Sequence, residues 1–484
     1  MRRYRVIALG MALGVVFAAC GRDEETATST TTPGDTTPGD TTDTTTAPQA
    51  AGLDEGGFGD LGVICSPAPE GTTLEETGDP GVTAESIQIS TVSDPGFVGR
   101  PGLNQELFDT AEAFASWCNE HGGINGRQID LKLRDAALAE FQQRTIEACE
   151  EGDFMMVGGG AVFDDTGQTE RLACGLPNVA GYVVTALAAE SDLTVQPVPN
   201  PANSLAAGDF NYLAEQFPET LSNIGVITGD INTTVVVAER YKEGIEQLGW
   251  DVVFDGQYPA NGVENWRPYI EPMQSNGVRG LIWVGEPVNL GQMLAEAKAI
   301  GYEFDWVRTD ANHYDPKLLS EAGADADGVY VRSVFAPFLE GAAEAGSASE
   351  QYDQLIDQYK PGGVKAYLGV QGLSGWLLFA TAARDCGADL TRDCVFEKIG
   401  TITDWNGGGL HAPMDLTSGT SPSCFDLFVV EGGEFQLAEI NPNNGIYNCD
   451  DANLLTLTGD YGDGARCPNP AFADDPKPSN CAEA

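Results

Sequence analysis

Basic residues are scarce in this sequence. The 484 residues include 25 Lys and Arg against 73 Asp and Glu, a formal net charge of −48. Because a surface of this charge repels phosphate backbones and anionic lipid headgroups, the composition argues against nucleic-acid binding and against electrostatic attachment to a membrane. The acidity is best explained as an adaptation for solubility in salty surroundings. Attraction of a cationic ligand is the alternative, which the overall charge supports only weakly.

Residues for metal binding or catalysis are also few. The three histidines, His121, His313 and His411, are far apart in sequence, and there is no Cys-x-x-Cys pair. No G-x-S-x-G motif is present, and the serine-rich DLTSGTSPS (415–423) has no candidate base beside it in sequence. We therefore expect no metal, no other cofactor and no enzymatic activity. A secreted hydrolase is the weaker alternative, because spacing in sequence does not report the distance between two carboxylates.

Long hydrophobic runs are missing after the first residues. The basic MRRYR precedes the apolar stretch Val6–Ala19, which is short for a membrane span and typical of a secretory signal peptide. Ala18 and Ala19 stand directly before Cys20, as in a bacterial lipobox, although Phe17 departs from the usual aliphatic residue. We predict a signal peptide over 1–19 and a lipid on Cys20 that anchors the protein to the outer face of the cell membrane. An ordinary signal peptide with an incidental cysteine is the alternative.

The cysteine count fits an oxidising compartment. Assigning Cys20 to lipid leaves ten of the 11 cysteines, an even number that can form five disulfides. Proximity in sequence favours three pairs and leaves two less certain ones, and the sequence alone does not fix the connectivity. The favoured pairs are Cys386–Cys394, Cys424–Cys449 and Cys467–Cys481, followed by Cys149–Cys174 and Cys65–Cys118.

The composition changes twice along the chain. Residues 20–60 are rich in Thr, Pro, Gly and Asp, so we expect a disordered tether behind the lipid, with a root-mean-square reach of roughly 35 Å. An N-terminal extension follows over 61–81. From Val82 onward, strand-like and helix-like segments alternate, which predicts right-handed βαβ units and parallel sheets.

The first alternating units illustrate the pattern. SIQISTVSD (86–94) predicts a strand, and the apolar spacing of 103–123 predicts a helix that stops at Gly122-Gly123. The stretch NEHGGINGRQIDLKLRD (119–135) then turns at Asn-Gly into a strand. We expect this strand to be buried, with Ile129, Leu131 and Leu133 on one face, and we expect its turn to support the fold and not to contact ligand.

The alternation restarts after PVPNPANS (197–204), and GVYVRSVFAPF (328–338) marks a second crossing. The predicted fold class is therefore α/β, with two Rossmann-like lobes whose parallel sheets are joined by a multi-strand hinge. We expect a first lobe over 82–202 plus 331–411 and a second lobe over 203–330 plus 412–450. Residues 411–438 look like a closing antiparallel piece, and 451–484 like a disulfide-pinned tail.

The order helix, NEHGGINGRQIDLKLRD, helix, GGG resembles the leucine/isoleucine/valine-type (type I) periplasmic solute-binding proteins of bacterial ABC importers. VITGD, AERYKEGIEQLGWDVV and WRPYIEPMQSNGVRGLIWVGEP are similar to the second lobe of that family, and the resemblance covers roughly residues 82–449. It implies a lipoprotein that captures a small solute between its lobes by hinge closure and delivers it to an ABC permease. We expect a monomer. A sensory module that docks to a membrane receptor is the alternative, since both uses need the same closing cleft.

Ligands of open α/β sheets bind beyond the carboxyl ends of the strands, so the residues that follow predicted strands are the site candidates. Their glycines let backbone N–H groups approach a ligand, and their aromatic side chains can form walls. In the first lobe they are Ser93, Asp94, Gly160, Ala161, Val162, Phe163, Gly181 and Tyr182; in the second lobe they are Asp230, Asn232, Thr233, Glu286, Asp310 and Tyr314.

Four acids among these candidates, Asp94, Asp230, Glu286 and Asp310, suggest a ligand with an ammonium or guanidinium group, although each could instead cap a helix or a turn. In the amino-acid-binding relatives an acid of the second lobe pairs with the ligand amine, and the resemblance implies this role for Asp310. The relatives' hydroxyl-bearing carboxylate loop corresponds here to AGYVVTAL (180–187), a departure that argues against a plain branched-chain amino acid. We expect a small polar solute, an amino acid or an amine-like compound.

Overall fold

The computed structural model describes residues 52–472, 477–478 and 480–481. The chain divides into Met1–Ala47 and one compact unit, Pro48–Ala484. The predicted signal peptide, the lipidated Cys20 and the tether as far as residue 51 lie outside the described residues. Among the helices of the described part, none combines the length and apolarity needed to cross a membrane.

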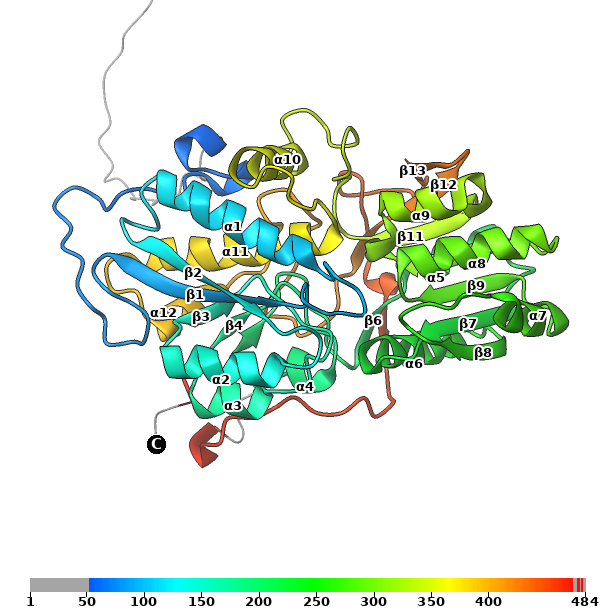
Figure 1. Ribbon diagram of the computed structural model, residues 1–484, viewed down its shortest axis with the longest axis horizontal. Helices are drawn as coiled ribbons and strands as arrows, with labels where there is room; N and C mark the ends of the chain where they lie inside the picture. Colours follow the sequence, from blue (N-terminus) through cyan, green and yellow to red (C-terminus); the bar gives the residue numbers. More distant parts are fainter. Residues whose placement is uncertain (1–51, 473–476, 479, 482–484) are drawn as a thin grey trace, which may run out of the picture. The chain divides into compact units, whose positions relative to one another are not determined.

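The first lobe is built on a five-stranded parallel sheet with helices on both faces (Figure 1). The order of its strands is β2-β1-β3-β4-β5. Helices α1 and α11 cover one face, with α10 packed on α1 and α12 on α11, while α2 and α3 lie on the other face. The strands are β1 (Ser86–Ser93), β2 (Gln128–Asp135), β3 (Met155–Val157), β4 (Asn178–Val179) and β5 (Thr194–Val195). The helices are α1 (Gln105–Glu120), α2 (Phe141–Glu151), α3 (Gln168–Ala173), α4 (Ala186–Ala189), α10 (Ala348–Tyr359), α11 (Tyr367–Cys386) and α12 (Arg392–Ile399).

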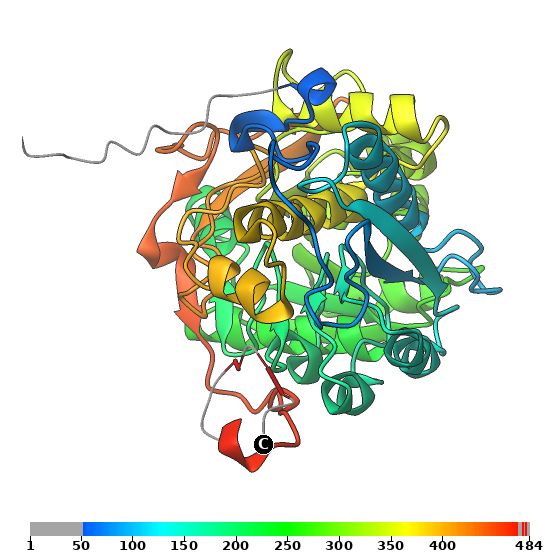
Figure 2. The ribbon, with the colours of Figure 1, turned by 90° about the vertical axis from the view of Figure 1, so that its left-hand side faces the viewer.

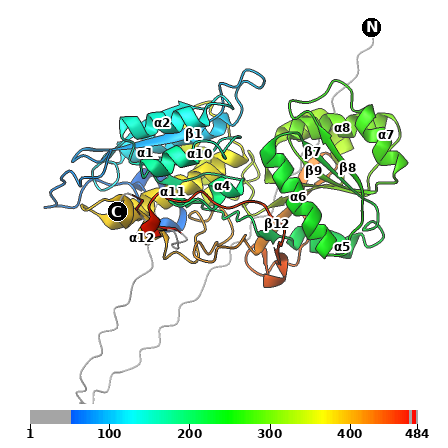
Figure 3. The same ribbon diagram turned by 90° about the horizontal axis from the view of Figure 1, so that it is seen from below.

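The second lobe is built on a mixed sheet of order β13-β12-β11-β10-β9-β7-β8, with β14 paired to β12. Its central strands read as continuous apolar runs because both faces are covered, by α5 and α6 on one side and by α7 and α8 on the other (Figure 3). The strands are β7 (Ile224–Gly229), β8 (Val252–Tyr258), β9 (Gly280–Val284), β10 (Trp306–Asp310), β11 (Val329–Ser333), β12 (Cys424–Glu431), β13 (Glu434–Leu437) and β14 (Asn448–Cys449). The helices are α5 (Gly208–Gln216), α6 (Asn232–Gln247), α7 (Arg267–Ser275), α8 (Pro287–Ala299) and α9 (Pro316–Ala322).

The chain passes between the two lobes at several points. It leaves the first lobe between β5 and β6 (Ser204–Ala206), returns after β11, and crosses again before β12. Strand β6 pairs with β15 (Leu454–Thr456) in a separate antiparallel ladder. The fold prediction of two α/β lobes joined by several strands is therefore confirmed, and the antiparallel closing piece is found as β12, β13 and β14.

The predicted tether ends earlier than expected. Residues 52–60, which the sequence assigns to disordered chain, form two 3-10 turns, Leu53–Glu55 and Gly59–Leu61. Phe58 is fully buried, Leu53 is nearly so, and the indole of Trp117 in α1 donates a hydrogen bond to the Leu53 carbonyl at 2.9 Å. These two apolar side chains supply enough burial to fix a segment whose average composition predicts disorder.

The expectation of a buried strand over RQIDLKLRD is also wrong. Strand β2 is an edge strand paired only with β1, and Leu133 is 38% exposed. Arg134 is buried instead, because its guanidinium lies 2.7 Å from the buried carboxylate of Asp153. Charged residues that point inward from an edge strand also discourage pairing with a second chain. The preceding turn keeps its predicted supporting role: a Cβ on Gly123 would lie 2.1 Å from the Arg127 carbonyl oxygen, so only glycine fits.

All ten remaining cysteines form disulfides, in the five pairs that the sequence favoured. The expected pair Cys467–Cys481 closes the C-terminal tail on itself. Hydrogen bonds make the attachment: Asp192 in the first lobe accepts from the Cys467 N–H at 2.6 Å and pairs with Arg466 at 2.9 Å. In Figure 2 the tail (red) lies at the lower edge of the first lobe.

The tail is also held on the second lobe, by Glu243 of α6. The Glu243 carboxylate accepts hydrogen bonds from Thr458, Gly459 and Tyr461, at 2.5–3.1 Å. Burial opposes ionisation, but these bonds prevail and lower the pKa of Glu243 to about 2. Since the folded pKa is depressed, the stabilisation is present above the unfolded pKa of 4.5 and is lost as the pH falls towards 2.

We therefore expect Glu243→Gln to release the tail locally at neutral pH. Amide exchange over residues 456–461 should accelerate roughly tenfold, because charge-assisted hydrogen bonds are replaced by weaker ones. Hydrogen–deuterium exchange with mass spectrometry measures this. Glu239→Gln, on the same helix but paired with Lys242, is the control, and equal exchange in the two variants would contradict the assignment.

Candidate functional site

A cavity of about 480 Å³ is walled by residues of both lobes. Its volume lies within the range of about 300–1,000 Å³ typical of small-molecule sites. The walls come from the loops that follow β1, β3, β4, β7, β9 and β10, and from the end of β11. The cavity thus lies at the carboxyl ends of both sheets, where the fold predicts a ligand.

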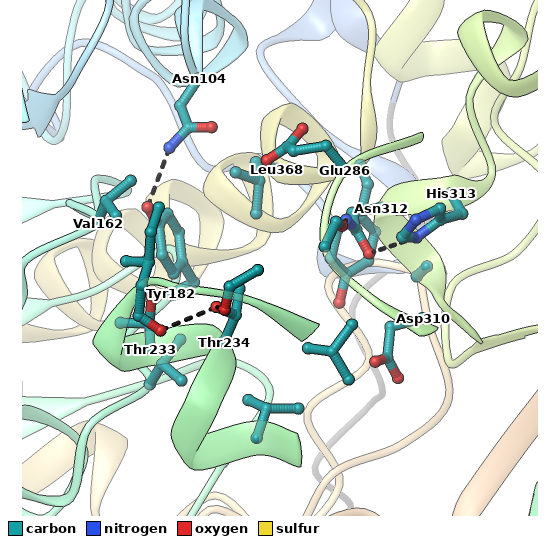
Figure 4. Close-up of a pocket in the computed structure, with 18 of the residues that line it drawn as sticks. Asn104, Val162, Tyr182, Thr233, Thr234, Glu286, Asp310, Asn312, His313 and Leu368 are labelled. Atoms are coloured by element: carbon teal, nitrogen blue, oxygen red, sulfur yellow. Dashed lines mark hydrogen bonds between the residues drawn. The ribbon is translucent and has the colours of Figure 1, made fainter. Parts of the chain in front are cut away.

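Seven of the predicted site residues line this cavity: Val162, Phe163, Tyr182, Asp230, Thr233, Glu286 and Asp310. Figure 4 shows Asn104, Val162 and Tyr182 of the first lobe on one side and Glu286, Asn312 and Asp310 of the second lobe on the other. The Asn104 amide donates to the Tyr182 hydroxyl at 3.0 Å, which fixes that ring at the wall.

The other seven, Ser93, Asp94, Gly160, Ala161, Gly181, Asn232 and Tyr314, lie outside the lining. Asp94 is fully buried and accepts from the N–H groups of Leu138 and Val162, both at 2.8 Å, so it ties two wall loops together. Burial raises its pKa despite these bonds. Tyr314 is buried against the ring of Phe428, with ring centroids 3.9 Å apart.

The remaining residues of that group also have structural neighbours. Ser93 donates to the Asn104 carbonyl at 2.8 Å. A Cβ on Gly160 would lie 2.3 Å from the Tyr182 ring, and one on Gly181 would lie 2.7 Å from the Gly158 oxygen. Asn232 reaches Asp165 of the first lobe at 3.4 Å. Ala161 is 1% exposed and belongs to a core beneath the wall. These positions shape the cavity wall from behind.

The acids predicted to attract an amine all have protein partners. Glu286 forms an ion pair with Arg100 of the first lobe, and this pair joins the two lobes across the cavity. Asp310 accepts from the Tyr241 hydroxyl at 2.7 and 2.8 Å and lies 3.0 Å from the Arg308 guanidinium. Asp230 accepts from the Ala260 N–H at 2.8 Å. A ligand ammonium would have to share these carboxylates with the groups that already hold them.

Sequence reasoning missed several polar residues of the lining. Arg332 is the last residue but one of β11, so the strand-end rule applied to the second crossing could have found it. Tyr367 and Gln371 lie on α11, and no signal near them in sequence connects them with the second lobe. Glu106 also lines the cavity, and burial raises its pKa against the opposing charges of Lys317 and Arg100. His313 is neutral at pH 7, since burial lowers its pKa to about 3.

Apolar side chains form much of the remaining wall. They come from both lobes and surround the polar groups, so the cavity suits a solute with a polar end and a carbon body. They include Leu103, Leu138, Val162, Phe163, Val183, Val184 and Val198, and also Leu205, Ile231, Val237, Val284 and Leu368.

One serine–histidine contact bears on the hydrolase alternative. Ser374 lies 2.8 Å from Nε2 of His411, as a nucleophile and its base would. The two side chains are 0% and 2% exposed, neither lines the cavity, and the indole of Trp405 donates to the same serine oxygen at 2.9 Å. This arrangement is a satisfied buried network inside the first lobe, and no substrate can reach it.

Comparisons with known proteins agree with this geometry. The family described as periplasmic binding protein matches residues 101–434. No curated protein sequence matches the chain. Among solved structures, the chain is similar to a branched-chain amino acid ABC transporter protein from Thermus thermophilus with bound valine, at 13% identity and a TM-score of 0.62, over 76% of this chain and 98% of the other.

Two further structures show the same fold. One is a fatty acid ABC transporter substrate-binding protein from Thermomonospora curvata, at 16% identity and a TM-score of 0.61, over 79% of this chain and 99% of the other. The other is a substrate-binding periplasmic protein from Ralstonia solanacearum, at 18% identity and a TM-score of 0.57, over 73% and 100%. Identities this low support a shared fold.

Proposed function

Because the chain belongs to the periplasmic binding protein family, we propose that it is the extracytoplasmic substrate-binding protein of an ABC importer. In this proposal a lipid on Cys20 anchors it to the outer face of the membrane, and the monomer presents its closed form to a permease. The lobes in question are residues 82–202 plus 331–411 and residues 203–330 plus 412–450.

One observation carries the proposal: the cavity of about 480 Å³ is lined by both lobes and is bridged by the Arg100–Glu286 ion pair. A solute that contacts both walls binds the closed arrangement better than an open one, and so drives closure. Moving the population from 1:99 to 99:1 takes about 5.5 kcal/mol of differential binding.

The proposed ligand is a small polar solute, an amino acid or an amine-like compound. Asp310 is the proposed partner of its amine, since this carboxylate lines the cavity and is 30% exposed. The apolar lining would hold the carbon body. Valine, which is bound in the similar Thermus thermophilus structure, and fatty acids, for which the Thermomonospora curvata protein is named, both combine a polar end with a carbon body.

Calorimetric titration against a metabolite panel, combined with X-ray scattering, tests the function. We expect at least one amine-bearing solute to bind, and its saturation to lower the radius of gyration. Val162→Trp, which fills the cavity, should abolish binding, whereas Val98→Trp is the matched control because Val98 is 89% exposed and outside the lining. Failure of every solute to bind, or saturation without a change in radius, would exclude capture by hinge closure.

A further inference from the structure

A positively charged side chain of the cavity wall, Arg332, has hydrogen-bond donors without protein partners in the described part of the chain. Nε and Nη2 of Arg332 are buried and have no hydrogen-bond partner among the described residues. Its side chain is 17% exposed and lines the cavity at the end of β11. A guanidinium cannot lose its charge in a protein, so unused donors of this kind favour an anionic partner.

The acids around Arg332 do not fill this role. Oδ2 of Asp209 lies 2.5 Å from Nε of Arg308, whereas its Oδ1 lies 3.9 Å from Nε of Arg332, beyond hydrogen-bond distance. Asp310 stands opposite Arg332 in the strand register and is held by Tyr241 and Arg308. Asp426, on the neighbouring strand β12, is fully buried, and burial raises its pKa to about 8, so it is neutral at pH 7.

Two further polar groups face the same cavity without partners. Gln371 is 6% exposed, and its amide makes no hydrogen bond within the described residues. The Tyr367 hydroxyl likewise makes no hydrogen bond within the described residues, and the Arg332 charge acts on it electrostatically. Tyr367 and Gln371 are four residues apart on α11, so they lie on one face of that helix. Both groups line the cavity, so they are available to hydrogen-bond a ligand there.

We propose that Arg332, Tyr367 and Gln371 form a carboxylate-binding subsite, so that the captured solute carries a carboxylate at the hinge side of the cavity. Arg332 would donate two hydrogen bonds to the carboxylate oxygens, the geometry in which guanidinium groups bind such anions most strongly. An ammonium group on the same solute would lie towards Asp310. This inference rests on the proposed function. It predicts that the ligand is an amino acid and not a simple amine.

Titration with matched ligands tests the subsite. The panel contains aliphatic and aromatic amino acids and organic acids, each beside its carboxamide and its decarboxylated amine. We expect binding of at least one carboxylate and at least tenfold weaker binding of its amide and amine. Arg332→Gln should weaken that carboxylate roughly ten- to hundredfold and abolish the preference over the amide. Arg279→Gln is the control, because Arg279 is 47% exposed and paired with Asp305.

The melting temperature and the ligand preference together distinguish a carboxylate subsite from a structural role of Arg332. They also distinguish failure of the subsite from failure of the proposed binding function. We expect Arg332→Gln to keep the melting temperature of the ligand-free protein within a few degrees, since the lost side chain has unused hydrogen bonds. A large drop in melting temperature with unchanged ligand preference would make Arg332 structural and overturn the subsite. Binding of amines or amides alone would overturn the subsite and leave the binding function standing. Binding of no member in any variant would overturn both.

Discussion

Asp209→Asn is expected to destabilise the protein by about 3–5 kcal/mol, because it leaves a buried guanidinium without its main partner. Asp209 and Arg308 are both 0% exposed, and their side chains are 2.5 Å apart. Asp310 offers Arg308 a second carboxylate at 3.0 Å, but that group also accepts from Tyr241. Arg308 further packs over the rings of Phe210 and Tyr241, so it cannot move out to water.

Urea unfolding followed by tryptophan fluorescence measures this effect, since Trp250 and Trp306 belong to the core of the same lobe. Glu296→Gln is the matched control: the Arg267–Glu296 pair lies on the surface, with side chains 53% and 32% exposed, and such pairs contribute about 0–1 kcal/mol. Similar losses of unfolding free energy in the two variants would show that the Asp209–Arg308 pair behaves as an exposed ion pair and not as a buried one. The loss should also weaken ligand binding, because Arg308 positions Asp310.

Asp426→Asn is expected to raise the free energy of unfolding at neutral pH, the opposite of the effect of Asp209→Asn. Asp426 is fully buried, neither of its carboxylate oxygens has a hydrogen-bond partner among the described residues, and burial raises its pKa from 3.8 to about 8. At pH 7 the folded protein therefore binds a proton that the unfolded chain releases. By linkage this costs stability on the order of 4 kcal/mol at pH 7. Asparagine has nothing to protonate and avoids the cost.

The pH dependence distinguishes this explanation from a packing effect. Because the folded pKa is raised, the penalty is absent below pH 3.8 and grows until the pH passes 8. The melting temperature of Asp426→Asn should exceed that of the natural protein at pH 7 and match it near pH 4. Asp415→Asn, at an exposed turn where Thr417 lowers the carboxyl pKa, is the control and should not stabilise at pH 7. A loss of stability at both pH values would mean that Asp426 is ionised and paired with Arg332.

Much of the fold could be predicted because its signals are local. Strands such as Ile224–Gly229 and Gly280–Val284 are short apolar runs bounded by polar turns, and helices such as Gln105–Glu120 carry apolar residues at helical spacing. Elements of two to four residues, such as β5, β6 and α4, are too short to show a period, and they were missed. The amphipathic α10 was also missed although its period is readable.

Only half of the predicted site residues line the candidate cavity, for a physical reason. The rule that ligands bind at the carboxyl ends of strands found Val162, Tyr182, Glu286 and Asp310, because it depends on chain order alone. It could not tell a residue that lines the cavity from one that supports the wall, such as Asp94 or Tyr314. That distinction depends on whether the side chain points into the cavity or into a neighbouring loop.

The sequence by itself determined the two-lobed α/β architecture, because it follows from periodicity along the chain; it favoured the five cysteine pairs by their spacing without fixing them. Only the tertiary structure decided which charges are available to a ligand. Glu286, Asp310 and Asp230 are engaged by Arg100, Tyr241 and the Ala260 N–H, from segments far from them in sequence. Arg332 keeps unused donors because its potential partners are committed or buried in neutral form. Electrostatic pairing depends on distance and burial in space, which composition does not contain.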